Sequence, residues 1–253
     1  MTNPRILYDD KIRGATITSS GVTSSSFAAT NAANDFLGIR TRVSALTDAY
    51  LRYDHGSAVS LTAAAIILSN ITSGASVIKL QHSPDDAAWT DAGDFTWRDP
   101  SVGPMFLTWA SISRRYWRLK ITDASNTDGY ISIARWMLGT YFEPARGSFI
   151  GASDDLMDYS QVMVGTGGVE TSVDLPTART KSLQFLVESE SEHDNWLAFR
   201  AAVKSTKYFL VSLDPDNASP HKRTLFAKTP RPVSLPQIFG ESYVAQVAIQ
   251  ERV

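Results

Sequence analysis

A short run near the middle of the chain alternates strictly between apolar and polar residues. Residues 116–121 read Tyr-Trp-Arg-Leu-Lys-Ile, so Trp117, Leu119 and Ile121 share one parity. Side chains of a β-strand point alternately to opposite faces, and the run therefore predicts a strand with one buried and one solvated face. Other short apolar runs recur between turn-forming residues from Val59 onward. The pattern predicts an all-β fold class.

A further strand is expected after the polar loop 123–129. Its apolar residues change parity between Ile133 and Trp136. A β-bulge adds one residue to a strand and so moves the following side chains to the other face. We therefore expect a bulge near Arg135.

Length and a change in composition divide the chain in two. At 253 residues it fits two compact units better than one. Residues 142–155 combine Pro144 and several glycines with small and acidic residues, which is typical of a linker. We expect a β-sandwich domain over residues 1–143 and a second β-rich domain over residues 144–253.

One helix is expected in the second domain, from about residue 190 to 205. Trp196, Phe199 and Val203 recur at helical spacing, and an approximate capping box begins at Ser191. Strands are expected before and after the helix, over residues 183–187, 208–213 and 243–249.

Charge and composition exclude several classes of function. The 24 basic and 26 acidic residues are well mixed and leave a formal net charge of -2, so no basic surface for nucleic acid is expected. The absence of cysteine removes disulfides and thiolate sites and suits folding in a reducing cytoplasm. No signal peptide is expected, because residues 1–8 lack a basic run followed by an apolar run. No membrane span is expected, because the most apolar stretch, Ala63–Leu68, is far too short.

No arrangement of residues predicts catalysis, a metal or a cofactor. The histidines are scattered, and no Gly-x-Ser-x-Gly motif is present. Gly165-Thr166-Gly167-Gly168 lacks the spacing of a phosphate loop and is typical of a hairpin turn. Asp123 begins a loop that resembles a calcium loop, but Ala134 stands where the bidentate Glu is required. We expect a protein that is not an enzyme.

Glycan cleavage is a further alternative, because it needs only two carboxyl groups across a cleft. The adjacent acids Asp85-Asp86 and Asp154-Asp155 could in principle supply them, yet adjacent acids in turns usually only solvate a loop. Neither pair is singled out as catalytic.

Three tryptophans of the first domain are candidate contact residues. Trp89, Trp97 and Trp109 fall in or near expected loops, where an exposed ring could stack on a sugar or anchor a protein. The alternative for each is packing in the core or at its edge. Trp117 and Trp136 lie within expected strands and are assigned to the core.

Three segments of the first domain carry a resemblance to a known family. They are Ser-Pro-Asp-Asp-Ala-Ala-Trp-Thr at 83–90, Arg-Tyr-Trp-Arg-Leu-Lys-Ile at 115–121 and the run from Tyr130 to Gly139. Together they resemble the end of a discoidin-type (F5/8 type C) jelly roll. Asp86 replaces the glycine expected in the first turn, so the resemblance implies the fold more directly than the ligand-binding loops.

The amino-acid sequence of residues 118–131 is similar to segments of tail proteins of long-tailed bacteriophages and prophages. The second domain resembles, by its pattern, the compact β-rich domains of tail-tip and distal tail proteins. The resemblance implies a homo-oligomeric structural protein of the tail tip or baseplate, located in the virion and assembled in the host cytoplasm. Its partners would be the tail tube and the tail-tip hub. The alternative is a carbohydrate-binding module that contacts a host-surface glycan.

Overall fold

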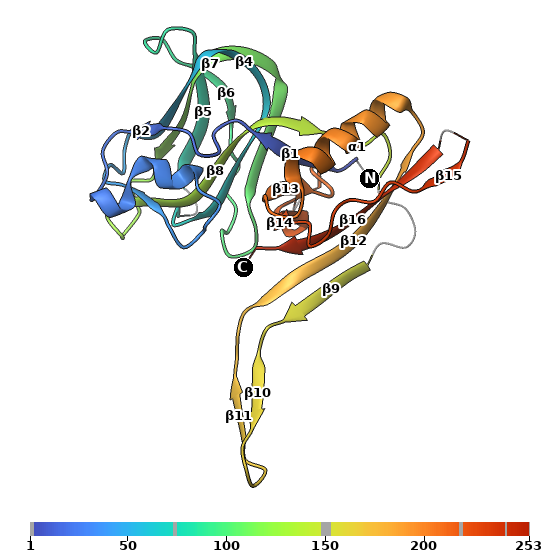
Figure 1. Cartoon of the computed structure of the whole chain (residues 1–253). Coiled ribbons are helices and arrows are strands. Elements are labelled where there is room, and N and C mark those ends of the chain that lie inside the picture. The colour runs from blue at the N-terminus through green and yellow to red at the C-terminus, as the bar shows by residue number, and fades with distance from the viewer. Residues whose placement is uncertain (1–2, 73–74, 148–152, 218–219, 241, 253) are drawn as a thin grey trace.

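The chain folds almost entirely into antiparallel β-structure. The computed structural model describes residues 3–72, 75–147, 153–217, 220–240 and 242–252. Most of its strands join in one large sheet with the order β6-β5-β7-β4-β8-β1-β13-β14-β16-β12-β9, to which β2, β3 and β15 are added at the side (Figure 1). The strands β10 and β11 form a separate two-stranded sheet. The expected all-β class is confirmed.

The first half of the chain supplies β1 to β8. The strands are β1 (Arg5–Asp10), β2 (Ile17–Ser19), β3 (Thr41–Val43), β4 (Ala49–Ser69), β5 (Val77–Ser83), β6 (Thr90–Asp94), β7 (Met105–Thr122) and β8 (Ile131–Phe142). Two 3-10 turns, η1 (Ser25–Phe27) and η2 (Ala29–Ala33), lie between β2 and β3. The long strands β4 and β7 pair along most of their length and carry the core of this half.

The expected strand at residues 116–121 is the last part of β7. Trp117, Leu119 and Ile121 are buried in the core, and the residues between them are partly exposed. Trp117 lies opposite Tyr53 of β4 and His82 of β5. The alternation in the sequence therefore located both the strand and its buried face.

The expected bulge near Arg135 is wrong. The pairing of β8 with β4 runs without a shift from the pair Ala63–Gly139 to the pair Ser69–Ile133. Residues 131–139 of β8 are all buried, because both faces of this strand are covered. The change of parity is nevertheless real, because Ile133 and Trp136 pack in the same hydrophobic cluster. It coincides with a distortion of the paired strand, where Leu68 has a φ of 49°, and not with an added residue.

The turn after β5 has a backbone that usually calls for glycine. Asp86 has a φ of 66°, in the left-handed region that glycine enters at little cost. Aspartate is among the residues that tolerate this conformation, and its carboxylate forms an ion pair with Arg52. The replacement of glycine by Asp86 therefore preserves the turn.

The second half of the chain supplies the remaining strands and one α-helix. The strands are β9 (Ser153–Asp158), β10 (Gln161–Val164), β11 (Glu170–Val173), β12 (Thr177–Val187), β13 (Phe209–Ser212), β14 (Thr224–Lys228), β15 (Gln237–Phe239) and β16 (Ser242–Glu251). The helix is α1 (Glu190–Val203), and a 3-10 turn, η3 (Pro220–Arg223), precedes β14. Residues 148–152 of the expected linker lie outside the described residues, and its last residues begin β9.

The expected helix is confirmed, with a different N-terminal cap. Trp196, Phe199 and Val203 are buried against the sheet. The cap is Ser189, whose hydroxyl accepts a hydrogen bond from the backbone N–H of Glu192 at 3.2 Å. The expected cap, Ser191, lies inside the helix, because the helix begins at Glu190.

The N-terminal strand β1 joins the two halves. It pairs with β8 through Leu7–Tyr141 and with β13 through Leu7–Leu210. Ile6 packs in the core of the second half. The sheet is therefore continuous across the expected domain boundary at residue 143, which itself stays a prediction.

Candidate functional site

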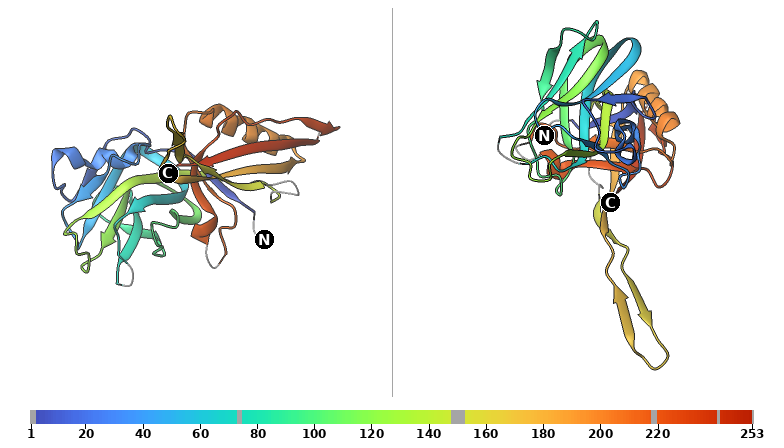
Figure 2. Two further views of the ribbon diagram at one scale, coloured as in Figure 1. Left: turned by 90° about the horizontal axis from the view of Figure 1, so that it is seen from below. Right: turned by 90° about the vertical axis from the view of Figure 1, so that its left-hand side faces the viewer.

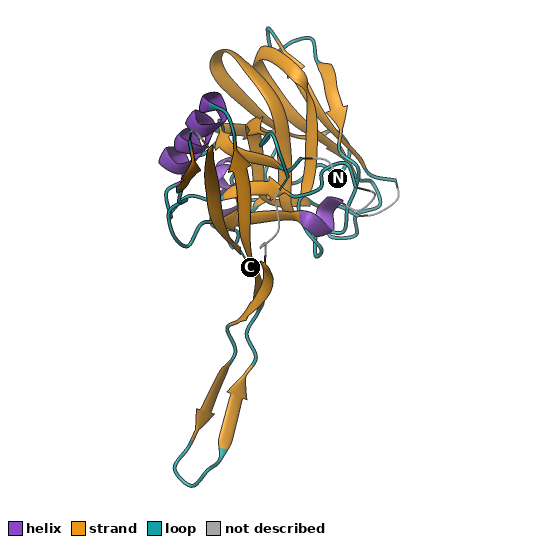
Figure 3. Cartoon of the chain, turned by 90° about the vertical axis from the view of Figure 1, so that its right-hand side faces the viewer, coloured by secondary structure: helices purple, strands orange, loops and turns teal. Residues whose placement is uncertain are grey.

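A long ribbon projects from the second half of the molecule. It consists of residues 153–177, here called the arm, and includes β9, β10, β11 and the turn between β10 and β11 (Figure 2). All of these residues are exposed except Ser160, which is half-buried. Figure 3 shows the hairpin β10–β11 at the far end, with no other element beside it. The sequence predicts the hairpin turn at residues 165–168 but not the projection of the arm.

The hairpin turn is formed as its glycines require. Gly167 and Gly168 have φ values of 104° and 80°, and the N–H of Gly165 donates to the carbonyl of Val169 at 2.7 Å. Residues with a Cβ adopt such φ values only under strain. The turn sets the register of the hairpin, in which Val162 lies opposite Ser172 and Met163 opposite Thr171.

The arm concentrates exposed apolar side chains. Of the fifteen large apolar side chains that are exposed in the described residues, nine belong to the arm. They are Leu156, Met157, Tyr159, Val162, Met163, Val164, Val169, Val173 and Leu175. Single exposed apolar residues are ordinary, whereas a contiguous group marks a surface that contacts another molecule.

Both faces of the hairpin tip are apolar. Val162 and Val164 share one face, and Met163 shares the other face with Val173, since opposed residues of an antiparallel pair lie on the same side. Val162, Met163 and Val164 are 64%, 60% and 64% exposed. Either face of the tip can therefore contact a surface of another molecule.

A second candidate site is a cavity in the first half of the chain, here called the Arg42 cavity. Its volume is about 260 Å³. The lining residues are Phe27, Gly38, Arg40, Arg42, Asn70, Asp128, Tyr130 and Ser132. They come from the segment after β2, from β3, from the end of β4 and from the start of β8.

Two aromatic rings hold the guanidinium of Arg42 in this cavity. Its central carbon lies 3.8 Å from the ring centroid of Phe27 and 4.6 Å from that of Tyr130. Its Nε is buried and has no hydrogen-bond partner within the described residues. A stacked guanidinium with unused donors is suited to hydroxyl or carboxylate oxygens of a small ligand.

The tryptophans Trp89, Trp97 and Trp109 are not assembled into one site. Each is partly buried, and no ring contact joins any two of them among the described residues. Trp97 donates its Nε1–H to the carbonyl of Ile71 at 2.8 Å, and Trp109 packs 5.7 Å from the ring of Trp117. The ring of Trp89 is covered by the guanidinium of Arg118 at 4.2 Å. The Arg42 cavity, which contains none of them, was missed because its members are dispersed over about a hundred residues.

The loop that resembles a calcium loop already uses its carboxylate. Asp123 is buried and accepts hydrogen bonds from Thr72, Ser125 and Asn126. Burial alone would raise the pKa of Asp123, but these hydrogen bonds outweigh it and lower the pKa. Within the described residues, no three His, Asp or Glu side chains gather as a metal site would need. No described helix is long and apolar enough to span a membrane.

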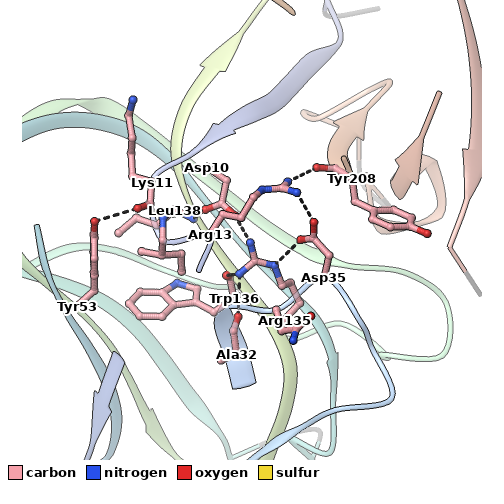
Figure 4. Close-up of polar contacts among 12 residues, drawn as sticks. Asp10, Lys11, Arg13, Ala32, Asp35, Tyr53, Arg135, Trp136, Leu138 and Tyr208 are labelled. Atoms are coloured by element: carbon pink, nitrogen blue, oxygen red, sulfur yellow. Dashed lines mark hydrogen bonds and ion pairs between the residues drawn. The ribbon is translucent and has the colours of Figure 1, made fainter. Parts of the chain in front are cut away.

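A buried ionic network connects the two halves of the molecule (Figure 4). Arg135 is fully buried and bonds to Asp10, to Asp35 at 3.2 Å and to the carbonyl of Ala32 at 2.9 Å. Arg13 bonds to the same Asp35 and to the backbone carbonyl of Tyr208 in the second half. The network therefore ties the segment before β3 and the strand β8 to the second half.

Comparisons with known proteins find a similarity of fold alone. No model of a protein family matches the sequence, and no curated protein matches it. A chitosan-binding module of a chitosanase/glucanase from Paenibacillus sp. IK-5 is 18% identical, with a TM-score of 0.42, and the match covers 51% of this chain and 97% of the module. A Clostridium perfringens module solved with GalNAc-β-1,3-galactose is 14% identical, with a TM-score of 0.42 and coverage of 53% and 99%.

A carbohydrate-binding module of AlyQ, solved with 4,5-unsaturated mannuronic acid, is also similar. It is 19% identical, with a TM-score of 0.42, and the match covers 52% of this chain and 96% of the module. These three modules are carbohydrate-binding β-sandwiches, and each matches about half of this chain.

Proposed function

We propose that this chain is a structural subunit that assembles with other copies of itself through the arm, in the tail tip of a long-tailed bacteriophage. The observation that carries the proposal is the group of exposed apolar side chains on both faces of the hairpin β10–β11. The chain then acts by binding and assembly, without catalysis.

The arm is poorly stabilised by the chain itself. An isolated two-stranded hairpin is marginally stable in water, and β10–β11 pairs with no third strand among the described residues. Its outer backbone groups are free to pair with another chain, as those of any open edge strand are. Assembly with another copy would bury the apolar faces of the hairpin and pair its open strand edges at the same time. An arm that projects from the molecule is accessible for such a contact.

The assignment to a phage tail is supported by the amino-acid sequence of residues 118–131 and by the pattern of strands and one helix in the second half, which both resemble tail proteins. In that setting the subunit forms or decorates a ring at the distal end of the tail tube. The tail tube and the tail-tip hub are the partners, and the virion is the location. The β-sandwich of the first half decorates the ring.

The experiment is the mass of the chain in solution, measured by light scattering over a range of concentrations. The wild-type chain is compared with a variant that carries Val162→Ser, Met163→Ser and Val164→Ser. We expect oligomers for the wild type and a shift to monomers for the variant. Val77→Ser removes a valine outside the arm that is 45% exposed and serves as the control. Equal masses for the wild type and the arm variant would refute the proposal.

The second candidate function is the binding of a host-surface glycan in the Arg42 cavity. It is favoured by the stacked Arg42 guanidinium, whose buried Nε lacks a partner in the described structure, and by the second guanidinium of Arg40 in the same wall. Sugars are commonly bound by planar polar groups next to aromatic rings. An acidic sugar would match the two positive charges.

The test is a glycan array probed with the wild type, with Arg42→Gln and with Arg114→Gln. Arg114 is exposed, forms no ion pair among the described residues and lies outside the cavity. We expect binding to be lost with Arg42→Gln and kept with Arg114→Gln. Binding that survives Arg42→Gln would place the glycan elsewhere.

A further inference from the structure

The arm is strongly acidic as well as apolar. Five of the 26 acidic residues and none of the 24 basic residues lie within residues 153–177, which leaves 24 basic against 21 acidic residues in the rest of the chain. Asp154 forms an ion pair with Lys181 of β12. The other four acids form no ion pair among the described residues; they are Asp155, Asp158, Glu170 and Asp174. A surface that receives the arm should therefore be basic.

The second half of the chain carries such a surface, here called the basic patch. It consists of Arg200, Lys204, Lys207 and Arg231. All four side chains are exposed. None of the four takes part in an ion pair within the described part of the chain.

Local structure brings the segments that carry these four residues together. Arg200 and Lys204 are one helical turn apart at the end of α1, and the N–H of Lys204 donates to the carbonyl of Arg200 at 3.0 Å. Lys204 then turns the chain with a φ of 53°. The hydroxyl of Thr229 donates to the carbonyl of Lys204 at 2.6 Å, which holds the segment from Lys228 to Arg231 against the end of the helix.

The arm does not reach the basic patch of its own chain. In Figures 1, 2 and 3 the hairpin β10–β11 points away from α1, and its tip lies at the opposite end of the molecule. The unpaired acids of the hairpin, Glu170 and Asp174, and the four unpaired bases of the patch therefore meet only between two copies. The aliphatic stems of lysine and arginine can also cover Val and Met side chains while their charged heads meet carboxylates.

We propose that the arm of one copy docks on the basic patch of the next copy. This inference rests on the proposed function and names the surface that receives the arm. The two surfaces differ, so the contact is heterologous, and repetition closes a ring if the rotation between copies permits it. Opposite charges on the two surfaces set the register and the order of the copies.

The test exchanges the charges of the two surfaces. A patch variant carries Lys204→Glu, Lys207→Glu and Arg231→Glu, and an arm variant carries Asp158→Lys, Glu170→Lys and Asp174→Lys. We expect each to raise the dissociation constant for self-association on the order of tenfold or more. A chain with all six substitutions should assemble again, because its arm is basic and its patch acidic. Arg114→Glu, a charge reversal outside both surfaces, should change nothing.

The outcomes separate the two proposals. If the patch variant assembles like the wild type while the Val162, Met163 and Val164 serine variant does not, the arm docks elsewhere and the inference is overturned. If neither the patch variant nor the arm variant assembles, and the chain with all six substitutions does not assemble either, direct pairing of arm and patch is overturned. If the serine variant assembles like the wild type, the proposed function itself is refuted.

Discussion

At the scale of single residues, the least expected feature is a fully buried guanidinium. The side chains of Arg135 and Asp10 are both 0% exposed. An uncompensated charge in a protein interior costs several kcal/mol, and here two carboxylates and two backbone carbonyls satisfy the guanidinium. The network is tolerated because its donors and acceptors are matched.

Removal of Arg135 should therefore be strongly destabilising. Arg135→Met leaves the carboxylate of Asp10 buried without its partner, and we expect the free energy of unfolding to fall by about 3–5 kcal/mol. Urea denaturation measures this change. Arg146→Met breaks the exposed pair with Glu188 and should leave the midpoint nearly unchanged. Similar losses of unfolding free energy for the two variants would contradict a stabilising role of the buried pair between Arg135 and Asp10.

A surface pair gives a prediction about pH. A hydrogen bond from Arg115 lowers the pKa of Asp54 to about 2. The folded-state pKa lies below that of an unfolded aspartate, about 3.9, so the stabilisation is present above that value and is lost as the pH falls toward 2. NMR titration of the Asp54 carboxyl carbon should give a midpoint near 2. With Arg115→Gln the midpoint should move up toward that of a free aspartate.

At the scale of elements, β1 unites the two halves, because it pairs with β8 on one side and with β13 on the other. Gly139 of β8 lies opposite Asp10 of β1, and the pairing shifts between Leu7 and Asp9. A Cβ at Gly139 would lie 2.1 Å from the backbone carbonyl oxygen of Asp9. Glycine is required here for close approach, not for an unusual φ.

Gly139→Ala should separate β1 from β8. Neither backbone can move without loss of strand pairing, so we expect a loss of about 1–3 kcal/mol in the free energy of unfolding. Thermal and urea denaturation both report it. Gly147→Ala is the matched control, because nothing lies within 4 Å of a Cβ at that position. An unchanged midpoint for Gly139→Ala would show that β1 can shift freely.

At the scale of the whole molecule, the arm contrasts with the rest of the chain. Three hydrophobic clusters of the described residues support one continuous sheet, and none of them includes a residue of the hairpin β10–β11. Stability is not uniform in such a structure, and segments with few buried contacts open first. The element that we propose for assembly is also the one that the chain stabilises least.

Hydrogen exchange should report this difference directly. In dilute monomer, amides of β10 and β11 should exchange rapidly, while those of β4 and β7 stay protected. After assembly we expect the hairpin amides to become protected, since the neighbouring copy covers them. The basic-patch substitutions should remove this protection without a change in β4 and β7. Protection of the hairpin in the monomer would contradict an open arm.

Local patterns in the sequence were sufficient for most elements. The alternation at residues 116–121, the helical spacing from Trp196 to Val203 and the glycine-rich turn at residues 165–168 each reflect a short-range property of the backbone. Such properties depend on which side chains can share a face or adopt a left-handed φ. They were therefore visible without knowledge of the fold. The bulge near Arg135 was wrong because a change of parity shows that the strand is distorted but does not show whether a residue is added.

Tertiary structure alone decided where the elements meet. By itself the sequence determined an all-β chain with one helix, little net charge and no thiol chemistry. Only the fold places Arg42 between Phe27 and Tyr130, Arg135 beside Asp10, and Val162 in solvent at the end of an arm. Such contacts join residues that are far apart in the sequence. They follow from the packing of the whole chain, as does the exposure of an apolar segment outside the core. No local pattern specifies either of them.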